Sequence, residues 1–500
     1  MVSRPVVLSG FMATGKSTVG KLVAERLGVP FVDTDAVLAS QTGKTVGELF
    51  ASEGEARFRE REAALVLPML ASGKPQVIAF GGGTVTVGAV RHAALEAGTV
   101  VTLTAPPEAI LARVSSLAER PNLASGSPVD RARDLLTLRR EAYGECHATI
   151  ATEKRTPESI ADAIARVAAL DALAVPLGSR SYRVEIADAE PTRLSDALAE
   201  LAPSSVIAIT DENVSRARGA WLRAAAPSVH VVTIAPGEMS KTIATVQRIW
   251  DEALARGVDR DAVIVAFGGG VVGDLAGFAA STLLRGVRCV QIATSLLAMV
   301  DASVGGKTGF DHAAGKNLIG AFFQPSRVVV DLEHLTTLPP RELACGFAEI
   351  VKIALVRDAA LLAMLDRYDG PAALRPIVRA AIAAKIRVVR DDEREAGVRA
   401  LLNLGHTVGH ALEAHGGFSR WLHGEAVAIG TVHELRASER LGLTPAGTAD
   451  RAAATFARFG LPTAVDRRDL EAAWPFVMSD KKRAAETLKL PVVTGEGEGR

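Results

Sequence analysis

The chain has 500 residues, of which 48% are hydrophobic and 4% aromatic, and its 57 basic residues balance 57 acidic ones. This length predicts about three domains with separate cores, and the neutral charge and scarce aromatic side chains argue against nucleic acid as a partner. The three cysteines are far apart, no secretory signal opens the chain, and no apolar run reaches the ~18 residues of a membrane helix. We therefore expect a cytoplasmic enzyme that spans no membrane.

From residue 6 to about residue 170, β-like runs alternate with helical segments. The runs cover residues 6–9, 31–33, 76–80 and 99–103. This alternation predicts a parallel sheet with flanking helices. A helix from Pro157 to about Leu170 is followed by a Pro/Gly/Ser-rich stretch, so we place a domain boundary near residue 173.

A phosphate-binding motif follows the first β-like run. Residues 10–17, Gly-Phe-Met-Ala-Thr-Gly-Lys-Ser, fit G-x-x-x-x-G-K-[ST], and a helical pattern follows from residue 18 to residue 27. In this context the loop N–H groups and the helix dipole bind phosphates, Lys16 reaches the β and γ oxygens, and Ser17 ligates Mg²⁺. Asp33 and Asp35 close the next strand, where one carboxylate can face the metal and the other a substrate hydroxyl. The motif predicts a small-molecule kinase.

Arginines and a glycine triplet indicate what this kinase phosphorylates. Arg59, Arg120 and Arg139 suit a carboxylate or a phosphate, and residues 81–83, all glycine, allow a ring to approach the backbone closely. In this order and spacing, residues 1 to 170 resemble shikimate kinase. Other P-loop kinases, such as gluconate kinase or a nucleoside-phosphate kinase, are the alternative. A nucleotide-binding module without turnover is another, because Ala13-Thr14 stands where relatives usually carry a glycine.

The resemblance to shikimate kinase implies a role for each matching position. Lys16 would be catalytic, Asp35 would assist deprotonation of a shikimate hydroxyl, and Asp33 would join Ser17 at Mg²⁺. The resemblance places ATP against Gly10, Ala13, Thr14, Gly15, Lys16, Ser17, Thr18, Arg113 and Arg120. It places shikimate against Asp35, Arg59, Gly81, Gly82, Gly83 and Arg139.

The rest of the chain predicts two further domains. A second set of β-like runs covers residues 205–209, 229–234, 262–267 and 328–331, and helical periodicity then dominates from Pro339-Pro340 to about residue 459. We therefore expect three domains: a P-loop kinase domain at 1–172, an α/β lobe at 173–338 and a helical lobe at 339–500.

Two groups of residues carry the chemistry of this second half. Residues 268–273 formally match G-x-G-x-x-G, but no acidic residue follows about 20 positions on, so a standard Rossmann site is not predicted. His406 and His410 lie one helical turn apart, and with Glu349 and His423 they offer the carboxylate and imidazoles of a catalytic zinc site with an open position. Surrounding cations suit a substrate with a phosphate and a carboxylate.

Residues 174 to 490 resemble 3-dehydroquinate synthase. The strings that carry the resemblance are residues 295–307, 315–317, 346–352 and 480–482. The family would bind zinc through Glu349, His406 and His423, which leaves His410 as a hydrogen-bonding residue at the reacting hydroxyl. Its catalytic residues would be Lys352, His410, Lys385 and Arg399. A metal-dependent polyol dehydrogenase, which would release NADH, is the alternative.

The synthase resemblance also implies binding residues and a reaction. NAD would contact Asp211, Asn213, Glu238, Lys241, Gly269, Gly270, Val271, Asp274, Thr294, Ser295, Lys316 and Thr337. Substrate would contact Arg285, Asp301, Lys307, Asn317, Lys352, Lys385, Arg399, Asn403 and Lys482. The reaction would convert 3-deoxy-D-arabino-heptulosonate 7-phosphate to 3-dehydroquinate and phosphate by oxidation, elimination, reduction and aldol closure, without net use of NAD. We expect a homodimer formed through this half.

Overall fold

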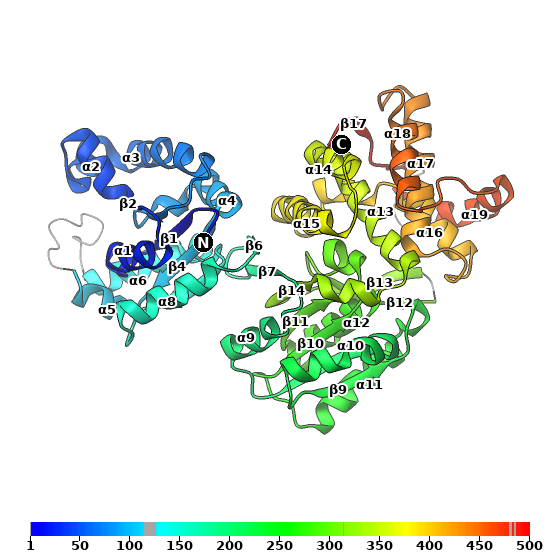
Figure 1. The fold of residues 1–500 in the computed structure, drawn as a ribbon, viewed down its shortest axis with the longest axis horizontal. Helices are drawn as coiled ribbons and strands as arrows, with labels where there is room; N and C mark the ends of the chain where they lie inside the picture. Colours follow the sequence, from blue (N-terminus) through cyan, green and yellow to red (C-terminus); the bar gives the residue numbers. More distant parts are fainter. Residues whose placement is uncertain (1, 115–126, 314, 480–482, 485–486) are drawn as a thin grey trace. The chain divides into compact units, whose positions relative to one another are not determined.

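The computed structural model describes residues 2–114, 127–313, 315–479, 483–484 and 487–500. The chain forms two compact units, residues 1–185 (unit 1) and residues 186–500 (unit 2), which run from blue to cyan-green and from green to red in Figure 1. Within the described residues, no helix is both long enough and apolar enough to cross a membrane.

Unit 1 is built on a parallel sheet with the strand order β2-β3-β1-β4-β5. The strands are β1 (Val6–Gly10), β2 (Phe31–Asp33), β3 (Val77–Ala79), β4 (Thr99–Thr104) and β5 (Ala148–Ala151). The helices are α1 (Lys16–Leu27), α2 (Thr34–Thr42), α3 (Val46–Ala71), α4 (Gly88–Ala97), α5 (Pro107–Ala112), α6 (Pro128–Leu138), α7 (Arg140–Gly144) and α8 (Pro157–Ala168), and η1 (Thr84–Thr86) is a short 3-10 helix.

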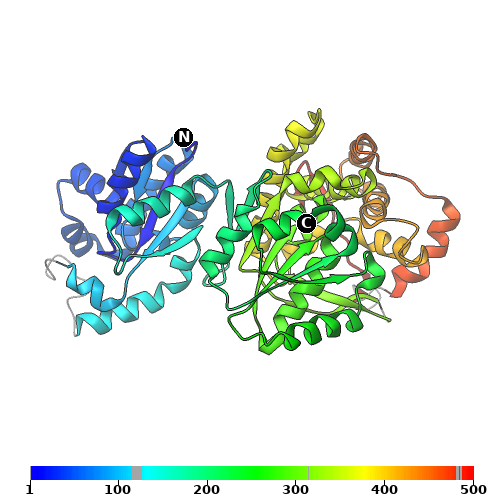
Figure 2. The same ribbon diagram turned by 60° about the horizontal axis from the view of Figure 1, so that its bottom comes forward.

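Helices cover both faces of this sheet (Figures 1 and 2). Successive side chains of a strand point to opposite faces, so Val7 of β1 packs into a core with α3, α4 and α6, whereas Val6 and Leu8 pack with α1 and α8. Burial on both faces explains why β1 and β3 are mostly apolar. The sheet thus provides a rigid base for the loops that follow its strands.

An antiparallel pair, β6 (Ala172–Val175) and β7 (Tyr182–Ala187), follows α8. An Arg4 guanidinium nitrogen donates to the Ala172 carbonyl at 2.9 Å and so ties β6 to the start of the chain. The boundary between the two units falls within β7.

The first part of unit 2 is an α/β lobe whose parallel strands follow the order β14-β11-β10-β8-β9. The strands are β8 (Val206–Asp211), β9 (His230–Ile234), β10 (Val263–Gly268), β11 (Arg288–Ala293) and β14 (Arg327–Asp331), and a hairpin joins β12 (Lys307–His312) to β13 (Gly315–Phe322). Helices α11 (Ile243–Ala255) and α12 (Gly270–Thr282) pack on one face of the parallel strands. Helices α9 (Thr192–Leu201) and α10 (Glu212–Ala225) pack on the other.

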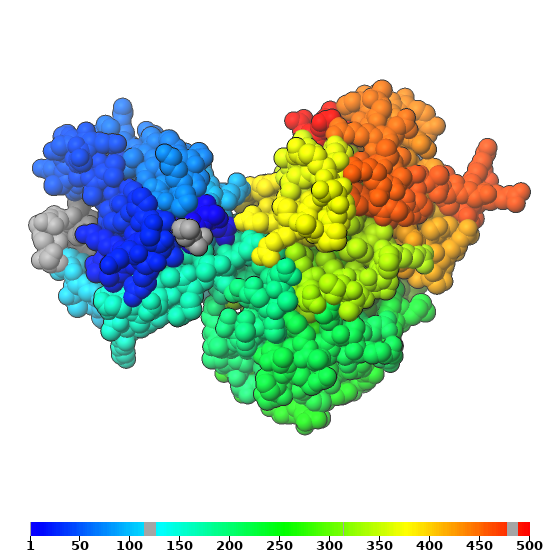
Figure 3. Space-filling view, in the orientation of Figure 1, coloured from blue at the N-terminus to red at the C-terminus, as the bar shows by residue number. Residues whose placement is uncertain are grey.

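The second part of unit 2 is helical. Its α-helices are α13 (Pro340–Arg357), α14 (Ala359–Asp366), α15 (Leu374–Asp391), α16 (His406–His415), α17 (His423–Arg440), α18 (Thr448–Arg458) and α19 (Arg467–Ser479). Helix α17 packs against α13, α16 and α18, and the orange atoms of Figure 3 mark the surface that the last of these helices form. Short strands close the chain: β15 (Arg483–Ala484), β16 (Thr487–Leu488), β17 (Val493–Gly495) and β18 (Glu498–Gly499).

The structure confirms the predicted fold class: a parallel-sheet kinase unit, then an α/β lobe followed by a helical lobe. At the glycine-rich residues 493–499, β17 and β18 form a hairpin whose Val493 is buried and whose Gly499 lies against Val356 of α13.

Candidate active sites

The phosphate-binding loop of unit 1 joins β1 to α1. Gly10 has φ 130°, and a Cβ there would lie 2.2 Å from the Leu103 carbonyl oxygen, so only glycine fits. Ala13 has φ 58°, a left-handed conformation that costs an L-residue about 1–2 kcal/mol. The Lys16 ammonium donates to the carbonyls of Gly10 and Phe11, each at 2.8 Å. The loop therefore encloses its lysine.

Two carboxylates face this loop from the end of β2. The Ser17 hydroxyl donates to Asp33 Oδ2 at 2.5 Å, and Asp33 Oδ1 caps α2 by accepting from the backbone N–H groups of Asp35 and Ala36. Asp35 lies two residues further on, in the first turn of α2. Asp33 thus reaches the loop serine, while Asp35 lines the cavity next to it.

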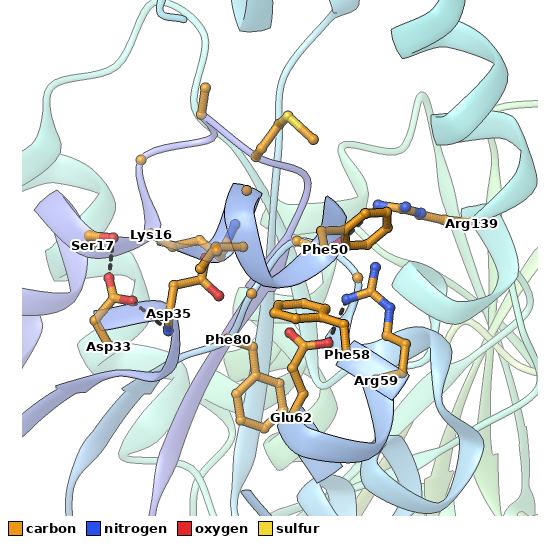
Figure 4. A pocket seen from close by; sticks show the side chains of 18 of the residues that line it. Lys16, Ser17, Asp33, Asp35, Phe50, Phe58, Arg59, Glu62, Phe80 and Arg139 are labelled. Carbon is orange, nitrogen blue, oxygen red and sulfur yellow. Dashed lines mark hydrogen bonds and ion pairs between the residues drawn. The ribbon is translucent and has the colours of Figure 1, made fainter. Parts of the chain in front are cut away.

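A cavity of about 280 Å³ brings most of the predicted kinase residues together. Figure 4 shows Lys16, Ser17, Asp33 and Asp35 on one side and Arg59, Glu62 and Arg139 on the other. The predicted residues that line it are Ala13, Gly15, Lys16, Ser17, Thr18, Asp33, Asp35, Arg59, Gly81, Gly82, Gly83 and Arg139. Phe50, Phe58 and Phe80 supply apolar walls, so the cavity offers phosphate-binding, acidic and guanidinium groups to one small molecule.

The glycine triplet after β3 lies against side chains of its own chain. A Cβ at Gly81 would lie 2.4 Å from Glu62 Oε1 and 2.7 Å from Asp35 Oδ1, and a Cβ at Gly83 would lie 1.9 Å from Arg59 Nη2. The space that a side chain would need is therefore occupied by the acids and the arginine of the cavity.

Both cavity arginines are held in place. Arg59 Nη1 donates to Glu62 Oε2 at 2.5 Å, and Glu62, itself 1% exposed, accepts from the Thr84 hydroxyl at 2.5 Å. Arg139 Nη1 donates to the Gly82 carbonyl at 3.2 Å, and its guanidinium lies 5.7 Å from the Phe11 ring centroid. Sequence reasoning missed Glu62, whose only signal is its position three residues after Arg59 in a helix.

Among the predicted ATP contacts that the structure describes, Gly10, Thr14 and Arg113 do not line this cavity. Arg113 follows α5 and donates to the hydroxyl and carbonyl of Thr152, at 2.9 and 3.2 Å, and it does not line the cavity. Arg120 lies outside the described residues.

In unit 2, α13, α16 and α17 bring three potential metal ligands together. His423 Nε2 lies 3.5 Å and His406 Nε2 3.9 Å from Glu349 Oε1, which is buried without a hydrogen-bond partner among the described residues. His406 Nδ1 faces the Leu404 carbonyl at 3.3 Å, which leaves Nε2 for a metal. One carboxylate and two imidazoles suit zinc with an open position.

His410 lies beside this set. Its ring centroid is 5.1 Å from that of His406 and 6.0 Å from that of His423, and it also forms a possible metal-binding group with Glu413 and His423. Glu413, which sequence reasoning missed, is 3% exposed, and its Oε2 lies 3.3 Å from His423 Nδ1. A carboxylate on the far nitrogen of a metal-bound histidine fixes the orientation and the tautomer of the ring.

A row of alternating charges leads from Glu413 to helix α12. Lys316 Nζ lies 3.1 Å from Glu413 Oε1 and 3.0 Å from Glu238 Oε1. Lys241 Nζ lies 3.9 Å from Glu238 and 2.6 Å from Asp274 of α12. We call these five residues, Glu413, Lys316, Glu238, Lys241 and Asp274, the charge row.

The predicted NAD contacts gather where the parallel strands end. Asp211 ends β8 and caps α10, Glu238 follows β9, Gly269 and Gly270 follow β10, and Thr294 and Ser295 follow β11. The Thr294 N–H donates to the Gly268 carbonyl at 3.0 Å. Helix α12 begins at Gly270, directly after the N-cap residue Gly269, and no side chain caps it. A helix N-terminus that follows a glycine-rich loop suits a pyrophosphate. Thr337 accepts a hydrogen bond from Arg218 at 3.1 Å.

The predicted substrate cations of unit 2 are mostly buried and paired. Lys385 Nζ donates to Asp301 Oδ1 at 2.5 Å, Lys352 Nζ pairs with Glu349, and Arg399 donates to the Gly305 carbonyl at 3.1 Å. Burial, aided by the charges of Arg399 and Lys352, lowers the pKa of Lys385 to about 8 although Asp301 opposes the shift.

Other predicted substrate residues are linked through a glutamate. Glu395 accepts from Lys307 Nζ and from Asn403 Nδ2, each at 2.6 Å, and sequence reasoning missed it. Asn317 Oδ1 accepts from Lys241 at 2.6 Å. Arg285 is exposed and lines a separate hollow with residues such as Arg260 and Phe323, which contains no other predicted substrate residue. Lys482 lies outside the described residues.

Comparison with known proteins finds a family for each unit. Residues 12–169 match the shikimate kinase family, residues 231–345 match the N-terminal domain of 3-dehydroquinate synthase, and residues 346–483 match its C-terminal domain.

Solved structures were also matched to parts of this chain. A 2-deoxy-scyllo-inosose synthase complexed with carbaglucose-6-phosphate, NAD⁺ and Co²⁺ is 24% identical, with a TM-score of 0.60, over 66% of this chain and 93% of that one. The 2-epi-5-epi-valiolone synthase of Streptomyces hygroscopicus subsp. jinggangensis 5008, with NAD⁺ and Zn²⁺ bound, is 29% identical, with a TM-score of 0.57, over 64% of this chain and 91% of that one. The shikimate kinase of Acinetobacter baumannii is 35% identical over 33% of this chain and 92% of that one, with a TM-score of 0.32.

Together the family matches account for most of both units. The first covers the residues that build the cavity of unit 1, and the other two cover the glycine loop and the zinc-type ligand set of unit 2. The chain therefore belongs to both families and is a fusion of a shikimate kinase with a 3-dehydroquinate synthase.

Proposed function

We propose that the chain catalyses its two reactions at two separate sites: ATP-dependent 3-phosphorylation of shikimate in the cavity of unit 1, and formation of 3-dehydroquinate from the heptulosonate phosphate at the metal-type set of unit 2. The observation that carries this proposal is that each unit has its own group of potential reacting side chains: the cavity residues in unit 1 and the carboxylate–imidazole set in unit 2. The proposed domains are residues 1–172 for the kinase, and residues 173–338 and 339–500 for the two lobes of the synthase.

In the kinase, the proposed roles follow from the two sides of the cavity. Lys16 leaves the carbonyls of the loop to bind the β and γ phosphates, with Gly10, Ala13, Thr14, Gly15 and Thr18 lining the loop and Arg113 and Arg120 joining from outside it. Ser17 and Asp33 are hydrogen-bonded to each other at 2.5 Å, and a hydroxyl and a carboxylate oxygen are ligand types that Mg²⁺ prefers. Asp35 accepts the proton of the attacking hydroxyl.

The opposite side of the cavity holds the acceptor. Arg59 and Arg139 are the proposed partners of the shikimate carboxylate, because fixed guanidinium groups bind carboxylates in two-bonded geometry. Glu62 keeps Arg59 turned towards the cavity. Gly81 to Gly83 lie beside both. A substrate panel tests this assignment: phosphorylation of gluconate or a nucleoside phosphate in preference to shikimate would contradict it, and ATP binding without turnover would indicate a sensing module.

In the synthase, the residues fit zinc and NAD. The buried oxygen of Glu349 without a hydrogen-bond partner and the two Nε2 atoms near it support a zinc site with His406 and His423. The strand-end residues support NAD binding by Asp211, Asn213, Glu238, Lys241, Gly269, Gly270, Val271, Asp274, Thr294, Ser295, Lys316 and Thr337. When bound, zinc polarises a substrate hydroxyl and NAD reversibly accepts its hydride.

The proposed substrate residues supply charge and proton transfer. His410 and Lys352 lie next to the ligand set and would hydrogen-bond the reacting hydroxyl. The buried Lys385 and the half-buried Asp301 form an ion pair that would bind a hydroxyl and the carboxylate. The phosphate would be bound by the cations Lys307, Arg399 and Lys482, with Asn317 and Asn403 as neutral donors. Arg285 is also expected on the phosphate side, but it lines a separate hollow without these residues.

The decisive test of the synthase assignment is the fate of the hydride. With the heptulosonate phosphate and catalytic NAD⁺, phosphate should appear at many equivalents per NAD, while NADH absorbance stays at the level of bound cofactor. A polyol dehydrogenase, the competing assignment, would instead accumulate one NADH per substrate consumed and release no phosphate.

We also propose a cytoplasmic homodimer formed through unit 2. The three cysteines are buried and free, as in reducing compartments. The outer strand β13 exposes about 40% of Leu318, Ile319 and Phe322, and an exposed apolar strand is usually covered by a partner. Light scattering of the wild type and of Ile319→Lys tests the dimer, which the lysine should weaken. Cell fractionation tests the location.

A further inference from the structure

The turn between β6 and β7, residues 177–181, is bonded to helix α7 of the kinase. The Ser179 N–H donates to Glu141 Oε2 at 2.7 Å, and the Gly178 N–H donates to Glu145 Oε1 at 3.2 Å. A Cβ at Gly178 would lie 1.9 Å from Glu141 Oε2, and one at Gly144 would lie 2.6 Å from the Gly178 carbonyl oxygen. At Gly144 an added Cβ would meet the backbone of the turn, so glycine is required there, whereas at Gly178 an added Cβ would displace the Glu141 carboxylate.

Helix α7 belongs to the shikimate side of the cavity. Arg139 is the residue directly before α7, and Tyr143 lies within it. The hydroxyl of Tyr143 and Nη1 of Arg139 both donate to the carbonyl of Gly82, in the glycine triplet. The position of α7 therefore decides where the Arg139 guanidinium lies relative to the triplet.

The strands on either side of the turn are also packed into unit 1. Ala174 of β6 belongs to the same core cluster as Tyr143 and Cys146, and Arg183 of β7 donates to the His147 carbonyl at 3.1 Å. All of these strand residues follow residue 169, where the match to the shikimate kinase family ends. The connection to the synthase half thus contributes to the kinase structure itself.

We propose that the turn 177–181 is a positioning element of the kinase, which fixes α7 and thereby aims Arg139 at the shikimate carboxylate. The proposal rests on the proposed role of Arg139. It predicts a selective effect: a disturbed turn weakens shikimate binding and leaves ATP binding unchanged, because Lys16 and Ser17 lie on the opposite side of the cavity (Figure 4).

Glycine substitutions in the full chain test the proposal. Gly178→Ala adds a methyl group against Glu141, whereas Gly73→Ala is the matched control, because Gly73 has nearly the same φ, 61° against 62°, but nothing within 4 Å of its Cβ position. Both variants carry the same backbone strain. Relative to the control, Gly178→Ala should raise the shikimate KM about tenfold, with the ATP KM and the synthase activity unchanged.

A second variant covers the case in which Gly178→Ala does not fold. Glu141→Gln keeps the shape of the side chain and weakens its bond to Ser179, so it should raise the shikimate KM about threefold. The proposal is overturned if the shikimate KM of the folded variants equals that of Gly73→Ala, or if the ATP KM rises in parallel. Arg139→Lys tests the role of Arg139 separately from the role of the turn. An unchanged shikimate KM in that variant would reject the role of Arg139 itself.

Discussion

Acid should destabilise unit 2 through one buried histidine. His334 is 1% exposed, and neither ring nitrogen has a hydrogen-bond partner among the described residues. Its ring packs edge-on against Trp221 and Phe267, at centroid distances of 4.8 and 5.4 Å. Burial among these rings lowers the pKa of His334 to about 4, although Asp331 opposes the shift.

The sign and size of the effect follow from linkage. Because the folded-state pKa lies below the ordinary value of 6.5, the unfolded chain takes up the proton first, so the free energy of unfolding falls between pH 6.5 and pH 4. A difference of about 2.5 pKa units corresponds to about 3 kcal/mol when the fall is complete, and to about 2 kcal/mol at pH 5.

Tryptophan fluorescence measures this loss in the intact protein. All four tryptophans, at positions 221, 250, 421 and 474, belong to unit 2, so urea unfolding followed by their emission reports on that unit. His334→Gln should lose about 2 kcal/mol less than wild type between pH 7.5 and pH 5. Equal losses in wild type and His334→Gln would refute the argument.

Three further predictions concern the two sites. Lys16→Ala should reduce shikimate phosphorylation by at least about 100-fold and leave 3-dehydroquinate formation intact; comparable loss of both activities in folded protein would reject independent sites. Chelation should stop the synthase reaction until Zn²⁺ is restored, whereas kinase activity should recover with Mg²⁺ alone. His406→Ala should bind zinc more weakly by calorimetry, and added Zn²⁺ should not restore its synthase activity. Full synthase activity without metal would contradict the proposed zinc ligands. Synthase kcat/KM should fall above about pH 8, because Lys385 then loses its proton and its charge, and Lys385→Arg should extend the active range to higher pH; identical profiles would contradict this.

Regular patterns made much of the fold predictable. The apolar runs at residues 6–9, 31–33, 76–80 and 99–103 correspond to β1, β2, β3 and β4. The sequence did not reveal β5 or β11. Strand β5, Ala-Thr-Ile-Ala, buries only alternate residues at the edge of its sheet, and β11 carries Arg288 and Gln291 within its run. Polar residues interrupt the pattern in β11, and the Gln291 side chain is buried because it donates to the Gly273 carbonyl at 3.2 Å.

The candidate sites were likewise predicted only in part. Helical spacing alone put His406 and His410 on one face, but it could not decide which of them meets Glu349, because that depends on how α13, α16 and α17 pack. Glu62, Glu395 and Glu413 were missed because a glutamate in a helix or turn usually carries no more than a surface charge. Their burial and their bonds to arginine, lysine and histidine appear only in three dimensions.

The charge row also has a thermodynamic consequence. It connects residues proposed for NAD, at Asp274 and Lys241, to Glu413 on the histidine of the metal-type set. If bound NAD changes the affinity for Zn²⁺ by some factor, then bound Zn²⁺ must change the affinity for NAD by the same factor. Titrating NAD with and without Zn²⁺, and Zn²⁺ with and without NAD, must therefore give one coupling free energy, and replacing Lys316 in the middle of the row should reduce that single quantity in both experiments.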